Sequence, residues 1–196
     1  MGTELKTELY NVFRSIEKEK LSESDKEELL RFFRVTKNPL IRNHIALVLS
    51  DVHYEKSIPY ILEKINNKET FTDNGSLVHA LAAFDMSGYL VDLVKIICEM
   101  GFEPRLMAYG IVEATLPYVQ TNEKKEVLKI LTDCQQKLEV DGDNGCQFHR
   151  FSHRRISKPN FSVSAGSSLA KISSAALTIV HCCQDGRPIE EKLESC

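Results

Sequence analysis

The 196-residue sequence has no tryptophan, only six cysteines, and no long apolar run. A membrane-spanning helix needs roughly 20 consecutive apolar residues, so the sequence predicts no transmembrane segment. Six cysteines are too sparse for a disulfide framework in a chain of this size, which favours a reducing, cytoplasmic location. The first residues carry charge and a helical pattern where a secretory signal would have an apolar core, so we expect no such signal.

An excess of charge of one sign is also missing, because the net charge is only -3. This balance gives the chain as a whole no strong attraction to nucleic acid. The distribution is uneven, however. Residues 1–140 hold 18 basic and 22 acidic residues, whereas residues 144–171 hold five basic residues and no acidic one. These five mark a basic arm near the C-terminus: Arg150, Arg154, Arg155, Lys158 and Lys171.

The signatures of catalysis are missing as well. Neither GxGxxG nor GxxxxGK[ST] occurs, which excludes the common phosphate-binding loops. Ser50, Asp51 and His53 are close in sequence, but they fall at a helix–helix turn without an oxyanion-hole element. His44 and His79 lie within helical patterns, where a packed histidine is the commoner explanation. We therefore expect a protein that is not an enzyme and uses no cofactor.

One group of residues resembles a set of metal ligands. Cys146, His149 and His153 are followed downstream by His181, Cys182 and Cys183. Zinc prefers four nitrogen or sulfur ligands in a tetrahedron, but this spacing matches no standard zinc finger. We interpret the group as incidental histidines and cysteines in a loop, and metal binding by Cys146, His149 and His153 stays an open alternative.

The most regular stretch runs from Asn38 to Ile65 and predicts two short helices that fold back on each other. Asn38 is a good N-cap, and Pro39 suits the first helical turn. Apolar residues then recur at helical spacing until a break at residues 51–56. The second helix is expected to start around Ser57, with Pro59 tolerated in its first turn. Neither helix can bury its apolar stripe alone, so the pair needs neighbours.

Similar patterns before and after this stretch predict further helices. We expect a capping box at Ser24 and Glu27, and a cap at Asn74. Gly101 is expected to end one helix in the C′ position, and Pro104 to open the next unit. The Phe32–Phe33 pair is expected to pack between the first helices. The further helices are expected at about residues 3–18, 24–35, 74–85, 88–100, 105–116, 121–138 and 167–181.

The helices form repeat units that start at Asn38, Asn74 and Pro104, and these starts are 36 and 30 residues apart. In the first two units, IALVLSD at 45–51 aligns with HALAAFD at 79–85. Such intervals are typical of a helical-repeat solenoid. The predicted fold is all-α: a short α-solenoid over residues 3–139, a flexible basic linker over 140–166, and a C-terminal helix and tail over 167–196. The last helix could cap the open end of the solenoid or meet a partner as a free amphipathic segment, and we favour weak docking or disorder over a defined partner helix.

The first unit resembles a HEAT-type repeat, in particular the short form of phycobilisome-lyase-like repeat proteins. The residues that carry the resemblance are Pro39, Arg42, Ala46, Leu49, Asp51, Ile58, Pro59 and Leu62. The other units lack the early arginine and the second-helix proline. The resemblance implies a stack of helical hairpins, and it says little about activity. Proteins of this kind are commonly interaction scaffolds, some resemble partner-neutralising proteins of bacteria, and a few are lyases.

The predicted function is therefore that of a non-catalytic scaffold that binds a protein partner on the solenoid surface. The second helix of each unit is expected to line that surface, and its acidic-leaning mixture favours a basic partner. Two alternatives stay open: a regulator whose Arg-rich arm contacts nucleic acid or an anionic membrane surface, and a HEAT-like lyase. The residues expected to contact the partner are Tyr60, Glu63, Lys64, Tyr89, Asp92, Lys95, Glu99 and Glu126.

Overall fold

The computed structural model describes residues 17–67, 74–143 and 168–182 of the chain. Every regular element within these ranges is a helix, and none of these residues lies in a strand. The prediction of an all-α protein is confirmed to this extent. Most of the helix expected at 3–18 and nearly all of the linker expected at 140–166 lie outside the described residues. The chain divides into two compact units, which are larger than the repeats predicted from the sequence. The first unit is Met1–Met86 and the second unit is Ser87–Cys196.

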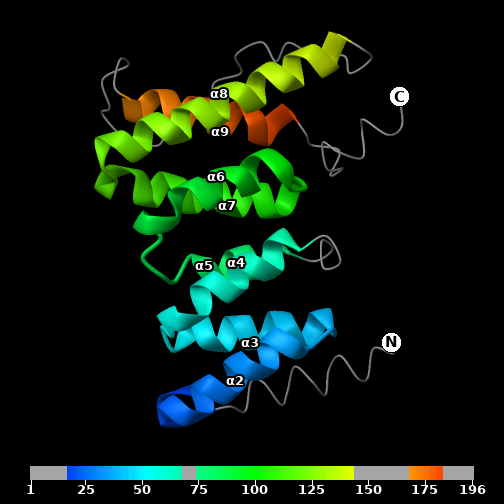
Figure 1. Cartoon of the computed structure of the whole chain (residues 1–196), viewed down its shortest axis with the longest axis vertical. Coiled ribbons are helices and arrows are strands. Elements are labelled where there is room, and N and C mark those ends of the chain that lie inside the picture. Colours follow the sequence, from blue (N-terminus) through cyan, green and yellow to red (C-terminus); the bar gives the residue numbers. More distant parts are fainter. Residues whose placement is uncertain (1–16, 68–73, 144–167, 183–196) are drawn as a thin grey trace. The chain divides into compact units, whose positions relative to one another are not determined.

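The described part of the first unit begins with a short 3₁₀ helix, and its longer helices follow in sequence. α3 packs mainly against α2 on one side and α5 on the other, and α4 packs against α5 (Figure 1). The 3₁₀ helix η2 connects α3 to α4 and also contacts α3. The elements are η1 (Lys18–Lys20), α2 (Glu23–Val35), α3 (Pro39–Asp51), η2 (Glu55–Ser57), α4 (Ile58–Asn66) and α5 (Gly75–Leu81).

The start of α3 is confirmed, and the start of α2 differs from the prediction. The side chain of Asn38 accepts hydrogen bonds from the backbone N–H groups of Leu40 and Ile41, as an N-cap should. At α2 the capping box is formed by Ser22 and Asp25, two residues earlier than the predicted Ser24 and Glu27. Ser22 has the extended backbone that an N-cap needs, whereas Ser24 already lies inside the helix.

The core of the first unit is made of the apolar stripes that the sequence pattern indicated. Its centre contains fully buried side chains from α2, α3, α4 and α5: Phe33, Ile45, Leu49, Ile61, Ile65, Leu77 and Leu81. Arg42, one of the residues of the HEAT resemblance, is also buried, and its Nε donates to the Asn43 side chain at 3.0 Å. Burial of these stripes between neighbouring helices is what keeps such short helices folded.

The prediction of a helix over 74–85 is wrong in length and in its cap. α5 ends at Leu81, and Asp85 lies beyond the helix, so only part of the predicted repeat is helical. Asn74 has a helical backbone and makes no side-chain cap. Its amide donates instead to the carbonyl of Ile65 at the end of α4, at 3.1 Å. The residues after α5 are held by a contact between His53 Nδ1 and the Ala83 carbonyl, at 3.1 Å.

The second unit consists of two pairs of packed helices. α6 packs against α7, and α8 packs against α9, while α6 also contacts α8 and α7 contacts α9 (Figure 1). Side chains from all four helices are fully buried, among them Leu93, Val112, Leu131 and Ile179. The elements are η4 (Ser87–Tyr89), α6 (Leu90–Glu99), α7 (Phe102–Thr115), η5 (Leu116–Tyr118), α8 (Thr121–Asp143) and α9 (Ser168–Cys182).

One predicted boundary in this unit is confirmed and one is wrong. Gly101 is the C′ residue of α6, which ends at Glu99 with Met100 as its C-cap, but its backbone is extended because it is also the N-cap of α7. α7 begins at Phe102, two residues before Pro104. Proline is tolerated there because the first N–H groups of a helix have no intrahelical partner. α7 ends at Thr115 and gives way to the 3₁₀ helix η5, which contains Pro117.

The two C-terminal helices are longer or better packed than predicted. α8 continues to Asp143, beyond the expected end near residue 138. α9 matches the predicted helix at 167–181 closely, but the expectation of weak docking or disorder is wrong for residues 168–182. Ile172, Ala176 and Ile179 of α9 are fully buried against the unit. The apolar stripe of α9 therefore completes the core of the second unit.

Candidate functional site

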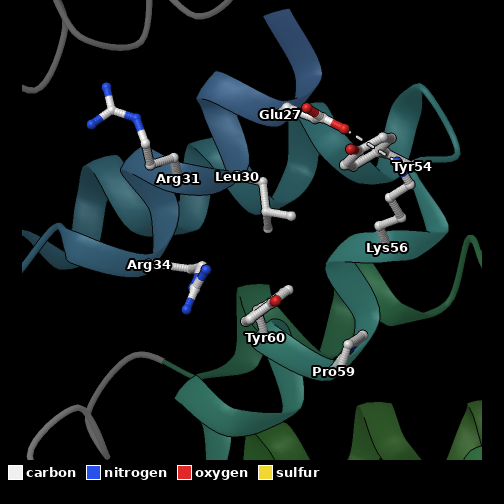
Figure 2. A pocket seen from close by; sticks show the side chains of 8 residues that line it. All are labelled: Glu27, Leu30, Arg31, Arg34, Tyr54, Lys56, Pro59 and Tyr60. Carbon is white, nitrogen blue, oxygen red and sulfur yellow. Dashed lines mark hydrogen bonds and ion pairs between the residues drawn. The ribbon is translucent and has the colours of Figure 1, made fainter. Parts of the chain in front are cut away.

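A groove in the first unit is the best candidate for a functional site (Figure 2). It has a volume of about 420 Å³ and lies between α2 on one side and η2 and the start of α4 on the other. Its shape is open, so a ligand could lie along it rather than being enclosed. The lining side chains are Glu27, Leu30, Arg31, Arg34, Tyr54, Lys56, Pro59 and Tyr60.

Two cations of the groove lie over the rings of its two tyrosines. The Arg34 guanidinium is 4.4 Å from the centre of the Tyr60 ring, and the Lys56 ammonium is 5.6 Å from the centre of the Tyr54 ring. Cations attract the negative face of an aromatic ring, and arginine also stacks on it. These contacts hold the long cationic side chains close to the groove and place positive charge on both of its sides.

The carboxylates near the groove neutralise this charge only in part. Lys56 Nζ pairs with Glu27 Oε1 at 3.2 Å, and Arg31 reaches Glu28 at 3.5 Å. The hydrogen bond to Glu27, and next the neighbouring Tyr54, raise the pKa of Lys56 above its ordinary value, which keeps the ammonium charged. The lining contains three cations, Arg31, Arg34 and Lys56, against one carboxylate. The groove is therefore positively charged, in contrast to the acidic-leaning surface that the sequence predicted.

The hydroxyl of Tyr54 is a second unusual feature of the groove. Tyr54 is 5% exposed, and its oxygen is buried with no hydrogen-bond partner among the described residues. Lys56 lies above the same ring and interacts only weakly with the hydroxyl, without a hydrogen bond of normal geometry. A buried hydroxyl without a partner costs free energy, about 1–3 kcal/mol. The free protein thus keeps a donor at the groove that it does not use itself.

Of the predicted contact residues, only Tyr60 lines this groove. Glu63 and Lys64 follow it on α4, Tyr89 lies in η4, and Glu126 lies on α8. The three remaining residues, Asp92, Lys95 and Glu99, belong to α6. The predicted set is thus spread over both units.

Sequence reasoning missed Arg34, Tyr54 and Lys56. Arg34 comes from α2, whereas Tyr54 precedes η2 and Lys56 lies within it, and no local motif connects the arginine to the other two. The spacing of Arg31 and Arg34, three residues apart on one helix face, was the only local sign of a basic surface.

The second unit contains a buried pair of thiols, Cys98 on α6 and Cys134 on α8. The hydrogen bond with Cys134, and next its burial, raise the pKa of the Cys98 thiol far above its ordinary value. A thiol must ionise to act as a nucleophile, so this shift disfavours a reactive thiolate at Cys98, while the same hydrogen bond lowers the pKa of the buried Cys134 thiol. The pair is best explained as small apolar filler between α6 and α8.

Tyr109, Glu113 and Ser173 form a hydrogen-bond network between α7 and α9. The Tyr109 hydroxyl donates to Glu113 Oε1 at 2.5 Å, and Ser173 Oγ donates to the same oxygen at 2.8 Å. Partial burial, followed by the hydrogen bond to Glu113, raises the pKa of Tyr109 to about 12. This network connects α9 to α7.

The raised pKa of Tyr109 predicts a dependence of stability on alkaline pH. The unfolded chain releases this proton near pH 10 and the folded protein near pH 12, so stability is full below pH 10 and falls between pH 10 and 12. We expect Tyr109→Phe to reduce that fall, as measured by the denaturant midpoint at both pH values. Tyr118→Phe is the control, because Tyr118 is 82% exposed. Equal slopes in the wild type and Tyr109→Phe would contradict this assignment.

Other predicted features lie outside the described residues. These are the basic arm with Arg150, Arg154, Arg155 and Lys158, and the first three candidate metal ligands, Cys146, His149 and His153. Within the described ranges, no cluster of three or more histidine, cysteine or acidic side chains could hold a metal ion. No helix in the described part of the chain is long and apolar enough to cross a membrane.

Comparison with known proteins provides no relative. No protein-family model, curated protein or solved structure matches the chain. The resemblance to HEAT-type repeats therefore depends on the sequence pattern alone.

Proposed function

We propose that this protein is a non-catalytic, protein-binding module built of HEAT-like helical hairpins that stack as a short α-solenoid. The groove between α2, η2 and α4 is its docking site for a partner. The observation that carries the proposal is the groove's lining of two tyrosines, each with a cation over its ring. Tyrosine and arginine are the residues most enriched among those that dominate binding energy at protein interfaces.

The size of the groove also supports a protein partner. A volume of about 420 Å³ accommodates a few side chains, and not a whole interface. A stable protein–protein interface buries about 800 Å² on each partner. The groove would therefore hold the anchoring residues of a partner, and exposed residues of the neighbouring surface would supply the rim. Glu63 on α4, from the predicted contact set, is exposed and lies one turn from Tyr60.

The proposal is tested by photo-crosslinking in the cells that naturally produce the protein. A photoreactive phenylalanine derivative is placed at Tyr60 in the groove or, as a control, at the exposed Tyr118 in η5. We expect a defined protein to be crosslinked from position 60 and not from position 118. The crosslinked protein, once purified, should bind the wild-type chain. Crosslinks to nucleic acid alone, no protein crosslink, or the same crosslinks from both positions would contradict a protein-docking groove.

A further inference from the structure

The groove combines an apolar floor with positively charged sides. Leu30 is 9% exposed, and it shares the floor with Pro59 and the rings of Tyr54 and Tyr60. Figure 2 shows the Leu30 side chain pointing into the space between the two rings, with Arg34 on one side and Lys56 on the other. A ligand that fits this surface has an apolar centre and negative charge at both ends.

The cations are available to such a ligand. Arg34 is exposed, and its guanidinium stacks on the Tyr60 ring, which leaves the edge of the guanidinium free to bind an anion. The Lys56 side chain is 66% exposed, and its pair with Glu27 is a surface ion pair that contributes little to stability. A carboxylate from a ligand can therefore bind Arg34 directly and can compete with Glu27 for Lys56.

We propose that the groove binds an acidic segment of the protein partner that carries one apolar side chain between flanking carboxylates. The apolar side chain lies on the floor between Leu30 and Tyr60, and the carboxylates bind Arg34 and Lys56. This inference rests on the proposed function, whose docking groove it assigns to a chemical class of partner. It also reverses the sign of partner charge that the sequence pattern favoured.

The Tyr54 hydroxyl is a further group of the groove that can bind the acidic segment. Its oxygen is buried without a partner in the described part of the chain, beneath the exposed Lys56 side chain. When Lys56 turns towards a ligand carboxylate, it uncovers the ring and allows the hydroxyl to donate to the ligand. A donor that is unused in the free protein and used in the complex contributes to specificity at the expense of stability.

The test measures binding of a fluorescein-labelled peptide to the full-length protein by fluorescence anisotropy. The peptide has a central leucine with two glutamates on each side, and its control has glutamines in their place. We expect the acidic peptide to bind about tenfold more tightly than the control. This preference should disappear in about 1 M NaCl, where the Debye length falls to about 3 Å.

Variants locate the binding site. The double variant Arg34→Gln, Lys56→Gln should lose the preference for the acidic peptide, whereas Lys125→Gln, Lys129→Gln on exposed positions of α8 should keep it. Tyr54→Phe should weaken binding of the acidic peptide severalfold and should not lower the thermal midpoint. Equal binding of both peptides, or an unchanged preference in the groove double variant, would overturn the proposal.

The two proposals fail in different ways. If the protein crosslinked at position 60 binds the groove double variant as tightly as the wild type, the acidic partner is wrong and the docking function stands. If no protein is crosslinked at position 60, the docking function itself is wrong, whatever the peptides do. Because Arg34 and Lys56 are exposed, their replacement should leave the circular dichroism spectrum unchanged, and this measurement separates lost binding from lost folding.

Discussion

Replacing Phe33 with alanine is expected to lower the free energy of unfolding by about 3–5 kcal/mol. Phe33 lies on α2 and is fully buried in the core of the first unit, where α2 packs against α3. Removing the ring takes away its burial and leaves a cavity that the short helices can fill only in part. Chemical denaturation followed by circular dichroism measures the loss.

The neighbouring Phe32 provides a matched control, because it has the same side chain on the same helix. Phe32 is 47% exposed, so Phe32→Ala should change the free energy of unfolding by no more than about 1 kcal/mol. Similar losses in the two variants would show that the orientation of α2 differs from the one described. The expectation from sequence that both phenylalanines pack in the core is correct for Phe33 and only half correct for Phe32.

The second large loss of stability is expected when Arg105 is replaced. Arg105 is fully buried in the second unit. Its guanidinium donates to the carbonyl of Met100 at 2.5 Å and to that of Ile179 at 3.4 Å, which joins the end of α6 to α9. Arg105→Ala removes both hydrogen bonds and leaves a large cavity. We expect a loss of about 3–5 kcal/mol in the free energy of unfolding.

A second substitution at this position separates the role of charge from that of volume. Arg105→Met fills most of the space without a buried charge, and it also removes Nε, which has no hydrogen-bond partner among the described residues. We expect it to recover much of the stability that alanine loses, because an apolar side chain of similar volume often replaces a buried ion well. Arg31→Ala, at an exposed position, is the control. A methionine variant as unstable as the alanine variant would show that the two carbonyls need the guanidinium.

The part of the fold that the sequence predicted best is the region with strong local signals. Asn38 and Pro39 specify the start of α3, because one accepts hydrogen bonds from the first N–H groups and the other lacks an N–H that would need a partner. The apolar spacing of α4 and α6 matches the helical period, and these stripes are buried as expected. Local chemistry and tertiary packing agree at these positions, which is why the sequence alone was sufficient.

The errors occur where tertiary contacts compete with local preference. Asn74 is a favourable N-cap residue, but its amide binds the Ile65 carbonyl at the end of α4. Ser22 and Ser24 both precede an acidic residue three positions later, so the sequence pattern alone does not decide which of them caps α2. Gly101 could adopt a left-handed conformation, but the immediate start of α7 requires extended backbone there. None of these outcomes can be derived from the spacing of residues.

The groove was even less accessible to sequence reasoning. The sequence pattern placed Tyr60 on the second helix of a repeat, but it made no prediction for the basic residues of α2. Arg34 lies 26 positions before Tyr60, and only the packing of the first unit brings its guanidinium over that ring. The burial of the Tyr54 hydroxyl likewise depends on the turn between α3 and α4. Contacts between positions that are far apart in sequence and share no motif can be seen only in the folded structure.

The attachment of α9 has a consequence for the continuity of the chain. α9 is held by side chains of α6, α7 and α8, and 24 residues connect it to the end of α8. Its position therefore does not require a covalent link, and a protease cut inside that connection would leave a nicked protein whose two pieces stay associated. The same packing would allow the second unit to be reconstituted from two separately produced fragments, as in a split-protein reporter.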